Sequence, residues 1–386
     1  MKNITKDILF VGVNDHDINL FEGQYELERG MAYNSYIIMD EKIAIMDTVD
    51  VACTDEWFAL VEEALNGKQP DYLVVHHMEP DHSANIKNFM DKYPSCTIVS
   101  SMQAFNMMKQ FFGTDFADRK MVVKEGSTLE LGKHTLSFVG APMVHWPEVL
   151  FSYDAYDKVL FSADGFGKFG ANDIEDPEGW ACEARRYYFG IVGKYGMQVQ
   201  NVLKKAANLD IQVICPLHGP VLDSNLGYYL DLYNTWSSYG VESEGVMIAY
   251  SSVYGHTKEA AQALAESLKA NGCSKVVVND LARDDMHEII EDAFRYGKIV
   301  LASITYNGSI FPHMKTFIDE LLERNYQNRT IGFIENGTWA PMAAKIMKGM
   351  FEKSKNITFC ENVVTVRSAM NEANKEQIKA LTKELL

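Results

Sequence analysis

The C-terminal part of the chain alternates regularly between short apolar runs and segments with helical spacing. Strands are expected at 246–250, 275–278, 299–303, 330–334 and 363–366, and helices at 257–270, 285–294, 312–322, 341–351 and 375–386. Strands that alternate with helices in this way form a parallel sheet with helices on both faces. The pattern therefore predicts a doubly wound, five-stranded parallel sheet over residues 245–386.

The first 244 residues follow a different pattern, with many short apolar runs and fewer helices. Strands are expected at 8–13, 33–39, 42–46, 72–75, 97–100, 135–139, 158–162 and 211–215, and helices at 55–65 and 183–207. Such a β-rich pattern indicates a sheet sandwich flanked by helices. We therefore expect two domains, 1–244 and 245–386.

The apolar run 72–75 is followed directly by the residues His-His-Met-Glu-Pro-Asp-His. If the backbone is extended there, His77, Glu79 and Asp81 point to one side of it. His82 would then lie behind them. These side chains could hold two metal ions, provided that the rest of the chain supplies the missing ligands. The alternative is an exposed loop that is merely rich in acid and histidine.

Three further ligand candidates, His145, Asp164 and His218, each follow an apolar run. A single histidine at the end of a strand is more often a hydrogen-bonded structural residue than a ligand. A buried carboxylate, however, is costly unless it is paired or binds a metal. Because the same placement recurs along the chain, we interpret the set as one metal constellation built at the ends of strands.

The loop 251–257 combines small hydroxylated residues with a glycine immediately before an expected helix. Backbone N–H groups and hydroxyls at a helix N-terminus can bind a phosphate. The loop lacks the glycine patterns of dinucleotide-binding and triphosphatase loops, and it has no lysine or arginine, which favours a single phosphate monoester. The alternative is an ordinary helix N-cap.

Two more loops follow the third and fourth strands of the same domain, at the edge where such sheets bind ligands. Tyr306 and Trp339 could pack on a flat ring there, although either could instead be a packing residue. The residues expected to bind a cofactor are Ser251, Ser252, Val253, Tyr254, Gly255, His256, Thr257, Ser303, Thr305, Tyr306, Asn307, Gly308, Asn336, Gly337, Thr338 and Trp339.

Taken in order, the metal constellation resembles the metallo-β-lactamase fold, whose hydrolases carry His-x-His-x-Asp-His and usually bind zinc. Here Glu79 replaces the second histidine. That replacement is the signature of the flavodiiron proteins, which the chain resembles over essentially its whole length, and carboxylate-rich ligation suits iron. The resemblance implies that one iron is bound by His77, Glu79 and His145, the other by Asp81, His82 and His218, and that Asp164 bridges the two. His76 and His134 fall outside this pattern, and His76 is a candidate for supporting the ligands from behind.

The resemblance also implies a fold, a cofactor and a reaction. The fold would be an αββα sandwich followed by a flavodoxin-like domain that binds FMN. The reaction would be the reduction of dioxygen to water, of nitric oxide to nitrous oxide, or of both; the sequence does not decide between the two substrates. Electrons would come from a rubredoxin or another small donor, or from a reduced deazaflavin. The family resemblance further implies a head-to-tail homodimer or a dimer of dimers, in which the FMN of one subunit faces the diiron site of the other.

Two alternative functions differ in the metal and in the chemistry. The first is a zinc-dependent hydrolase of the β-lactamase fold fused to a flavodoxin-like module, against which Glu79 argues. The second is an electron carrier without enzymatic activity, against which the complete ligand set argues.

Composition limits the partners and the location. The formal net charge of −17 argues against nucleic acids and anionic membranes. The N-terminus does not resemble a signal peptide, and no apolar run is long enough to span a bilayer. The six cysteines form no Cys-x-x-Cys pair, so we expect reduced thiols, a cytoplasmic protein and no rubredoxin-type iron site. Lys345 and Lys348 could form a local basic patch for an acidic donor.

Overall fold

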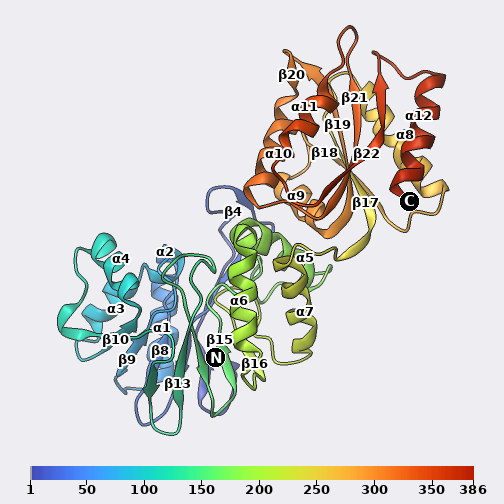
Figure 1. The fold of residues 1–386 in the computed structure, drawn as a ribbon. Helices are drawn as coiled ribbons and strands as arrows, with labels where there is room; N and C mark the ends of the chain where they lie inside the picture. The colour runs from blue at the N-terminus through green and yellow to red at the C-terminus, as the bar shows by residue number, and fades with distance from the viewer. Residues whose placement is uncertain (1) are drawn as a thin grey trace. The chain divides into compact units, whose positions relative to one another are not determined.

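The computed structural model describes residues 2–386, and the chain divides into two compact units, Met1–Asn234 and Thr235–Leu386 (Figure 1). Each unit has its own sheets and its own hydrophobic core. Among the described residues, no helix combines the length and the apolar character that crossing a bilayer requires.

The first unit contains two large mixed sheets. The seven-stranded sheet has the order β1 (Lys2–Asn3), β2 (Ile8–Phe10), β7 (Tyr36–Ile38), β8 (Ala44–Met46), β9 (Tyr72–Val74), β10 (Thr97–Ser100) and β11 (Lys120–Val122). The five-stranded sheet has the order β12 (Thr128–Glu130), β13 (Thr135–Gly140), β14 (Leu150–Asp154), β15 (Val159–Phe161) and β16 (Val213–Cys215). Two small ribbons pair β3 (Val13–Asp15) with β6 (Met31–Tyr33) and β4 (Leu20–Phe21) with β5 (Tyr25–Glu26).

Alternation along the strands divides the apolar side chains of this unit between two cores. Ile37 and Ile45 belong to the core that includes Trp57 of α1 (Thr54–Leu65). Their neighbours Tyr36 and Met46 belong instead to the core shared with the second sheet. Successive side chains of a strand point to opposite faces, so each sheet faces helices on one side and the other sheet on its inner side. The predicted αββα sandwich is confirmed.

The remaining helices of this unit are short and lie outside the two sheets (Figure 1). They are α2 (Pro80–Ser83), α3 (Ile86–Lys92), α4 (Met102–Phe112), α5 (Trp180–Tyr187) and α6 (Gly196–Ala206); α7 (Leu226–Ser237) continues past the boundary between the units.

Two expectations for this unit were wrong in detail. The helix expected over 183–207 is interrupted, because a π-helical turn (Tyr188–Val192) and a 3₁₀ turn (Gly193–Tyr195) separate α5 from α6. Gly190 lies in the π-helical turn, where a Cβ atom would meet the ring of Tyr25 at 2.8 Å. The apolar run 8–13 is likewise two strands that separate at Gly12, where a Cβ would lie 2.7 Å from the backbone oxygen of Tyr33.

The second unit is built on one twisted sheet. Its parallel strands have the order β18 (Val276–Asp280), β17 (Ser243–Tyr250), β19 (Tyr296–Tyr306), β21 (Arg329–Asn336) and β22 (Ile357–Val366). Numbered along the chain this order is 2-1-3-4-5, which is the flavodoxin-like arrangement. The predicted five-stranded parallel sheet is confirmed, and β20 (Ser309–Ile310) adds a short antiparallel strand beside β19.

Five helices cover the two faces of this sheet. They are α8 (His256–Ala270), α9 (Met286–Arg295), α10 (Pro312–Glu323), α11 (Ala343–Met350) and α12 (Glu372–Leu385). The last begins before its expected start at 375, because Asn371 and Asn374 form a reciprocal capping box. All five parallel strands end at the same edge of the sheet, which brings the predicted cofactor loops together.

Candidate metal centre and flavin pocket

The metal-ligand candidates of the first unit lie in loops and turns that follow buried strands. Strand β9 ends at Val74, and the chain then turns so that Glu79 is the N-cap residue of α2. Asp81 and His82 therefore lie in a helical turn, and the expectation of an extended backbone through Asp81 is wrong. Pro80, at the first helical position, favours this start because its fixed φ suits a helix.

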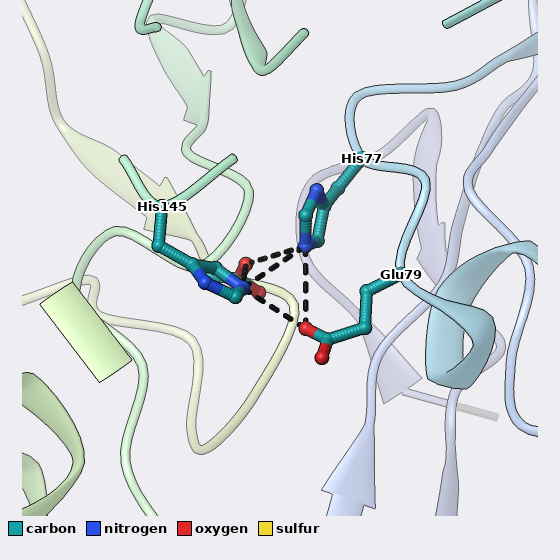
Figure 2. Close-up of side chains that lie close together, drawn as sticks. His77, Glu79 and His145 are labelled. Carbon is teal, nitrogen blue, oxygen red and sulfur yellow. Dashed lines mark hydrogen bonds and ion pairs between the residues drawn. The ribbon is translucent and has the colours of Figure 1, made fainter. Parts of the chain in front are cut away.

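One group of side chains brings together His77, Glu79, His145 and Asp164. Figure 2 labels the first three of these residues. The Nε2 atom of His145 lies 2.9 Å from Oε2 of Glu79 and 3.1 Å from Nε2 of His77. The Oδ2 atom of Asp164 lies 3.1 Å from Nε2 of His77 and 3.3 Å from Nε2 of His145. Nitrogen and oxygen atoms from four side chains thus converge on one point.

A second group combines Asp81, His82 and His218. The Nε2 atoms of His82 and His218 are 3.0 Å apart, and Oδ2 of Asp81 lies 3.2 Å from His218. The other oxygen of Asp164, Oδ1, lies 3.7 Å from Nε2 of His218. Asp164 therefore directs one carboxylate oxygen toward each group.

The donor atoms of both groups fit two metal ions. Both oxygens of Asp81 and both oxygens of Asp164 are buried and accept no hydrogen bond. Pairs of imidazole Nε2 atoms at 3.0–3.1 Å face each other across each group. Buried carboxylates without partners are strongly destabilising, and a cation at each point would satisfy them together with the imidazole lone pairs. The set contains only nitrogen and oxygen donors, which suits iron.

The charges of the first group are strongly coupled. Burial alone would lower the pKa of His145, but the neighbouring carboxylates of Asp164 and Glu79 outweigh it and raise the pKa to about 9. Burial alone would raise the pKa of Asp164, but the charges of His77 and His145 hold it below its usual value. Protons on the imidazoles therefore compensate the carboxylates whenever metal is missing, and metal binding has to displace them.

Residues behind the ligands fix their orientation. Nδ1 of His218 lies 2.9 Å from the backbone oxygen of Ala32, and Nδ1 of His77 lies 2.8 Å from Oε1 of Glu148. Sequence reasoning missed the role of Glu148, although it stands three residues after His145. The only signal was the polar segment His-Trp-Pro-Glu itself.

His76 and His134 lie outside both groups. Nδ1 of His76 is 2.5 Å from Asp47 and its Nε2 is 2.8 Å from Ser152, so its ring is held between the two sheets. Asp47, which sequence reasoning also missed, accepts the backbone N–H of His76 as well. His134 pairs with the buried Asp154 at 2.9 Å.

Aromatic rings enclose the second group. The rings of Phe21 and Tyr33 meet His218 edge-on, with centroids 5.7 and 5.9 Å away, and the ring of Tyr187 lies 5.5 Å from it. All three aromatic residues are buried. They provide a wall of low polarity, which strengthens the electrostatic interactions inside the site.

The second unit holds a cavity of ≈ 700 Å³ at the carboxyl edge of its sheet. The predicted residues that line it are Ser252, Val253, Tyr254, His256, Thr257, Thr305, Tyr306, Asn307, Gly308, Asn336, Gly337, Thr338 and Trp339. Ser251, Gly255 and Ser303 do not line it. Gly255 caps α8 with a positive φ of 95°, and Ser251 is buried with an Oγ atom that has no partner.

The cavity has a fourth loop that sequence reasoning missed. Ser368, between β22 and α12, lines the cavity, and its Oγ lies 3.0 Å from Oγ1 of Thr338. The lining contains no lysine or arginine, while Tyr254 and Trp339 are 91% and 88% exposed. A helix N-terminus, neutral donors and exposed aromatic rings together fit a flavin with one phosphate.

The fold and the two sites define a class of protein: a metallo-β-lactamase-like domain with a buried, carboxylate-rich site for two metals, joined to a flavodoxin-like domain. The model of the ODP family beta lactamase matches residues 31–219, and the model of a flavodoxin domain matches residues 247–385. The chain belongs to the flavodiiron protein family.

Individual relatives agree with this membership. A nitric oxide reductase of Moorella thermoacetica is 30% identical over 374 residues, which are 94% of this chain and 92% of the relative. The rubredoxin oxygen:oxidoreductase of Desulfovibrio gigas superposes with a TM-score of 0.92 at 26% identity, covering 100% of this chain and 97% of that one. The flavodiiron protein of Giardia intestinalis has the same fold, with a TM-score of 0.88 at 24% identity, covering 99% of this chain and 95% of that one.

Proposed function

We propose that the protein is an oxidoreductase that reduces dioxygen to water, nitric oxide to nitrous oxide, or both, at a non-haem diiron site supplied with electrons by FMN. The observation that carries the proposal is Asp164, whose two buried oxygens face two separate groups of histidine and carboxylate ligands. The relatives named nitric oxide reductase and rubredoxin oxygen:oxidoreductase support the same two substrates.

The proposed ligands are those that the sequence predicts. One iron is held by His77, Glu79 and His145, the other by Asp81, His82 and His218, and Asp164 bridges them. A zinc hydrolase is not favoured, because Glu79 replaces a histidine of the hydrolase pattern and gives the first group a carboxylate that suits iron.

Bound FMN would supply electrons singly or in pairs, and the two iron ions would bind and reduce the diatomic substrate. The residues of the chain would bind the two iron ions, compensate part of their charge and enclose the site. Glu79, Asp81 and Asp164 offset part of the positive charge of two cations. The buried rings around His218 exclude bulk water from the second group.

The proposed FMN site uses the residues predicted from the sequence. The N-terminus of α8, with Ser252 and Thr257 at the cavity, is placed to hold the phosphate. Ser251 has an unpartnered hydroxyl beneath the same loop. Tyr254, Tyr306 and Trp339 offer rings to the isoalloxazine.

The domain organisation and the assembly belong to the same proposal. We assign the iron site to residues 1–244 and the FMN site to residues 245–386. We further propose a head-to-tail homodimer or a dimer of such dimers, since the family arrangement pairs the FMN of one subunit with the iron site of the other. A cytoplasmic location agrees with the six free cysteines.

Replacing Trp339 by alanine is expected to weaken FMN binding roughly 2- to 12-fold, because one aromatic contact contributes about 0.5–1.5 kcal/mol beyond its buried area. The dissociation constant is measured by flavin fluorescence during titration of the FMN-free protein. Tyr156→Ala, which removes an exposed aromatic ring from the first unit, is the matched control and should bind FMN normally. If W339A and wild type bound FMN with equal affinity, Trp339 would not contribute to FMN binding.

The proposed electron donor is a rubredoxin, with a reduced deazaflavin as the alternative. Lys345 and Lys348 are exposed on α11, directly after the cavity loop, in a chain of net charge −17. The double variant K345E/K348E is expected to lower rubredoxin-driven turnover about 3- to 10-fold at low salt, because complementary charges mainly accelerate association. Dithionite-driven turnover should not change.

The control for this basic patch is the double variant K375E/K379E, which reverses two exposed charges on α12 of the same unit. An equal loss of rubredoxin-driven turnover in both double variants would show a general effect of the net charge. Unchanged rubredoxin-driven turnover in K345E/K348E would exclude the patch as the docking surface.

The function itself is tested by parallel turnover assays with nitric oxide and with dioxygen. Iron-loaded, FMN-loaded protein should consume at least one of them, whereas zinc-loaded protein with the same FMN content should consume nitric oxide at no measurable rate. If iron-loaded protein reduced neither substrate, the function that remains would be that of an electron carrier without enzymatic activity. Tight retention of zinc without iron in the protein as isolated would favour the hydrolase.

A further inference from the structure

Glu148 is a fully buried carboxylate that touches the metal ligands without belonging to them. Its side chain has no exposed surface. Oε1 lies 2.8 Å from Nδ1 of His77 and 2.9 Å from the backbone nitrogen of Met78, whereas Oε2 has no hydrogen-bond partner. A carboxylate can only accept from an N–H, so this contact places the His77 proton on Nδ1 and leaves the Nε2 lone pair directed into the first group.

The ligands of the second group are supported differently. Nδ1 of His218 faces the backbone oxygen of Ala32 at 2.9 Å, and Nδ1 of His82 faces that of Thr48 at 3.4 Å. These acceptors are neutral carbonyls. Only His77, among these three histidines, has a carboxylate behind it, so the two groups differ in the charge that surrounds them.

The segment that contains Glu148 serves the first group in three ways. His145 supplies a ligand, Trp146 packs edge-on against the ring of His77 with centroids 5.3 Å apart, and Glu148 holds the far side of that ring. One short loop between β13 and β14 thus fixes two ligands of the same proposed iron. The second group receives no such support from this loop.

We propose that Glu148 is a positioning residue that makes the two iron positions unequal: it orients His77, makes its imidazole a stronger donor, and adds negative charge beside the His77–Glu79–His145 position. The inference rests on the proposed diiron function. A carboxylate behind a ligating histidine raises ligand basicity, and negative charge beside a metal stabilises its higher oxidation state. An iron ion at this position would therefore be held more tightly and would be the first to become ferric.

The test compares wild type with Glu148→Gln in the full-length, FMN-loaded protein. Ferrous iron is titrated anaerobically into each metal-free protein against a chelator, and each loaded protein is then titrated reductively. In E148Q, one of two iron equivalents should bind about 10–100-fold more weakly, which is the usual cost of removing such an outer partner. One of the two iron reduction steps should also move to higher potential.

Two further variants separate charge from structure. Glu148→Asp keeps the carboxylate but shortens the side chain, so its reduction steps should stay closer to wild type than those of E148Q. Asp154→Asn breaks another buried carboxylate–histidine pair of this unit, the one with His134, and neither residue of that pair touches a proposed ligand. It should leave iron affinity and both reduction steps unchanged, and circular dichroism and FMN content verify folding throughout.

Wild-type affinity and unchanged reduction steps in E148Q would overturn the inference. An equal loss at both irons, or the same loss in D154N, would also overturn it, because the effect would then be a general loss of packing. If wild type itself fails to bind two irons, the proposed function fails instead, and the two failures are thereby distinguished.

Discussion

Replacement of Asp164 by alanine is expected to prevent assembly of the metal pair while FMN binding stays intact. Among the proposed ligands, Asp164 has an oxygen toward each group, and its loss leaves His77 and His145 without the carboxylate that lies near both of them. Because site assembly depends on all ligands together, iron content should fall to less than about half of the wild-type value, and turnover should fall with it. Iron and flavin are quantified on the same sample.

The control for this variant lies at the other end of the same strand. Asp157 precedes β15 and Asp164 follows it, so Asp157→Ala perturbs the same element away from the metals. D157A should keep its iron. Wild-type iron content in D164A would eliminate the bridging role, and loss of flavin as well as iron would indicate that the chain had not folded.

Replacement of Glu79 by histidine is expected to convert the ligand set to the hydrolase pattern His-x-His-x-Asp-His. The first group would lose the carboxylate that lies 2.9 Å from His145, and with it the negative charge that stabilises ferric iron. We expect zinc to be retained in preference to iron, and nitric oxide turnover to fall at least about 100-fold, because the loss of a direct ligand should cost no less than the roughly 10–100-fold effect of losing a residue behind a ligand.

Metal analysis after growth with both metals, followed by the turnover assay, checks this expectation. Glu125→His provides the comparison, because it introduces a histidine at an exposed glutamate that pairs with Lys205 on the surface of the same unit. If E79H retained iron and wild-type turnover, Glu79 would not distinguish a reductase from a hydrolase.

The sequence predicts the architecture well where periodicity is strong. Each parallel strand of the second unit has an apolar run, and a helix separates it from the next, so only their boundaries shift. Periodicity does not predict the interruption of a helix where a distant segment of the chain packs closely against it. At Gly190, in the π-helical turn that interrupts an expected helix, the ring of Tyr25 occupies the space of a side chain, and Tyr25 is distant in sequence.

The ligand candidates were predictable for a chemical reason. A carboxylate or an imidazole directly after a buried strand is costly without a partner, so each one stands out in the sequence. The supporting residues do not stand out in this way. Glu148 is 71 positions from His77, and Asp47 is 29 positions from His76, so neither contact leaves a local pattern. Ser368 was missed for the same reason.

The central claim is that catalytic electron transfer from FMN to the substrate passes through the metal pair. The most direct test is to measure flavin reoxidation in one preparation of the protein. The preparation is divided into an iron-loaded and a metal-free portion, and iron and FMN are quantified in each. Each portion is reduced anaerobically and mixed with nitric oxide or dioxygen while flavin absorbance and products are followed. We predict that nitric oxide, dioxygen or both reoxidise the flavin of the iron-loaded portion rapidly, with nitrous oxide or water as product, and that nitric oxide leaves the metal-free portion reduced. If every gas that reoxidises the iron-loaded portion reoxidised the metal-free portion at the same rate, the account would be contradicted.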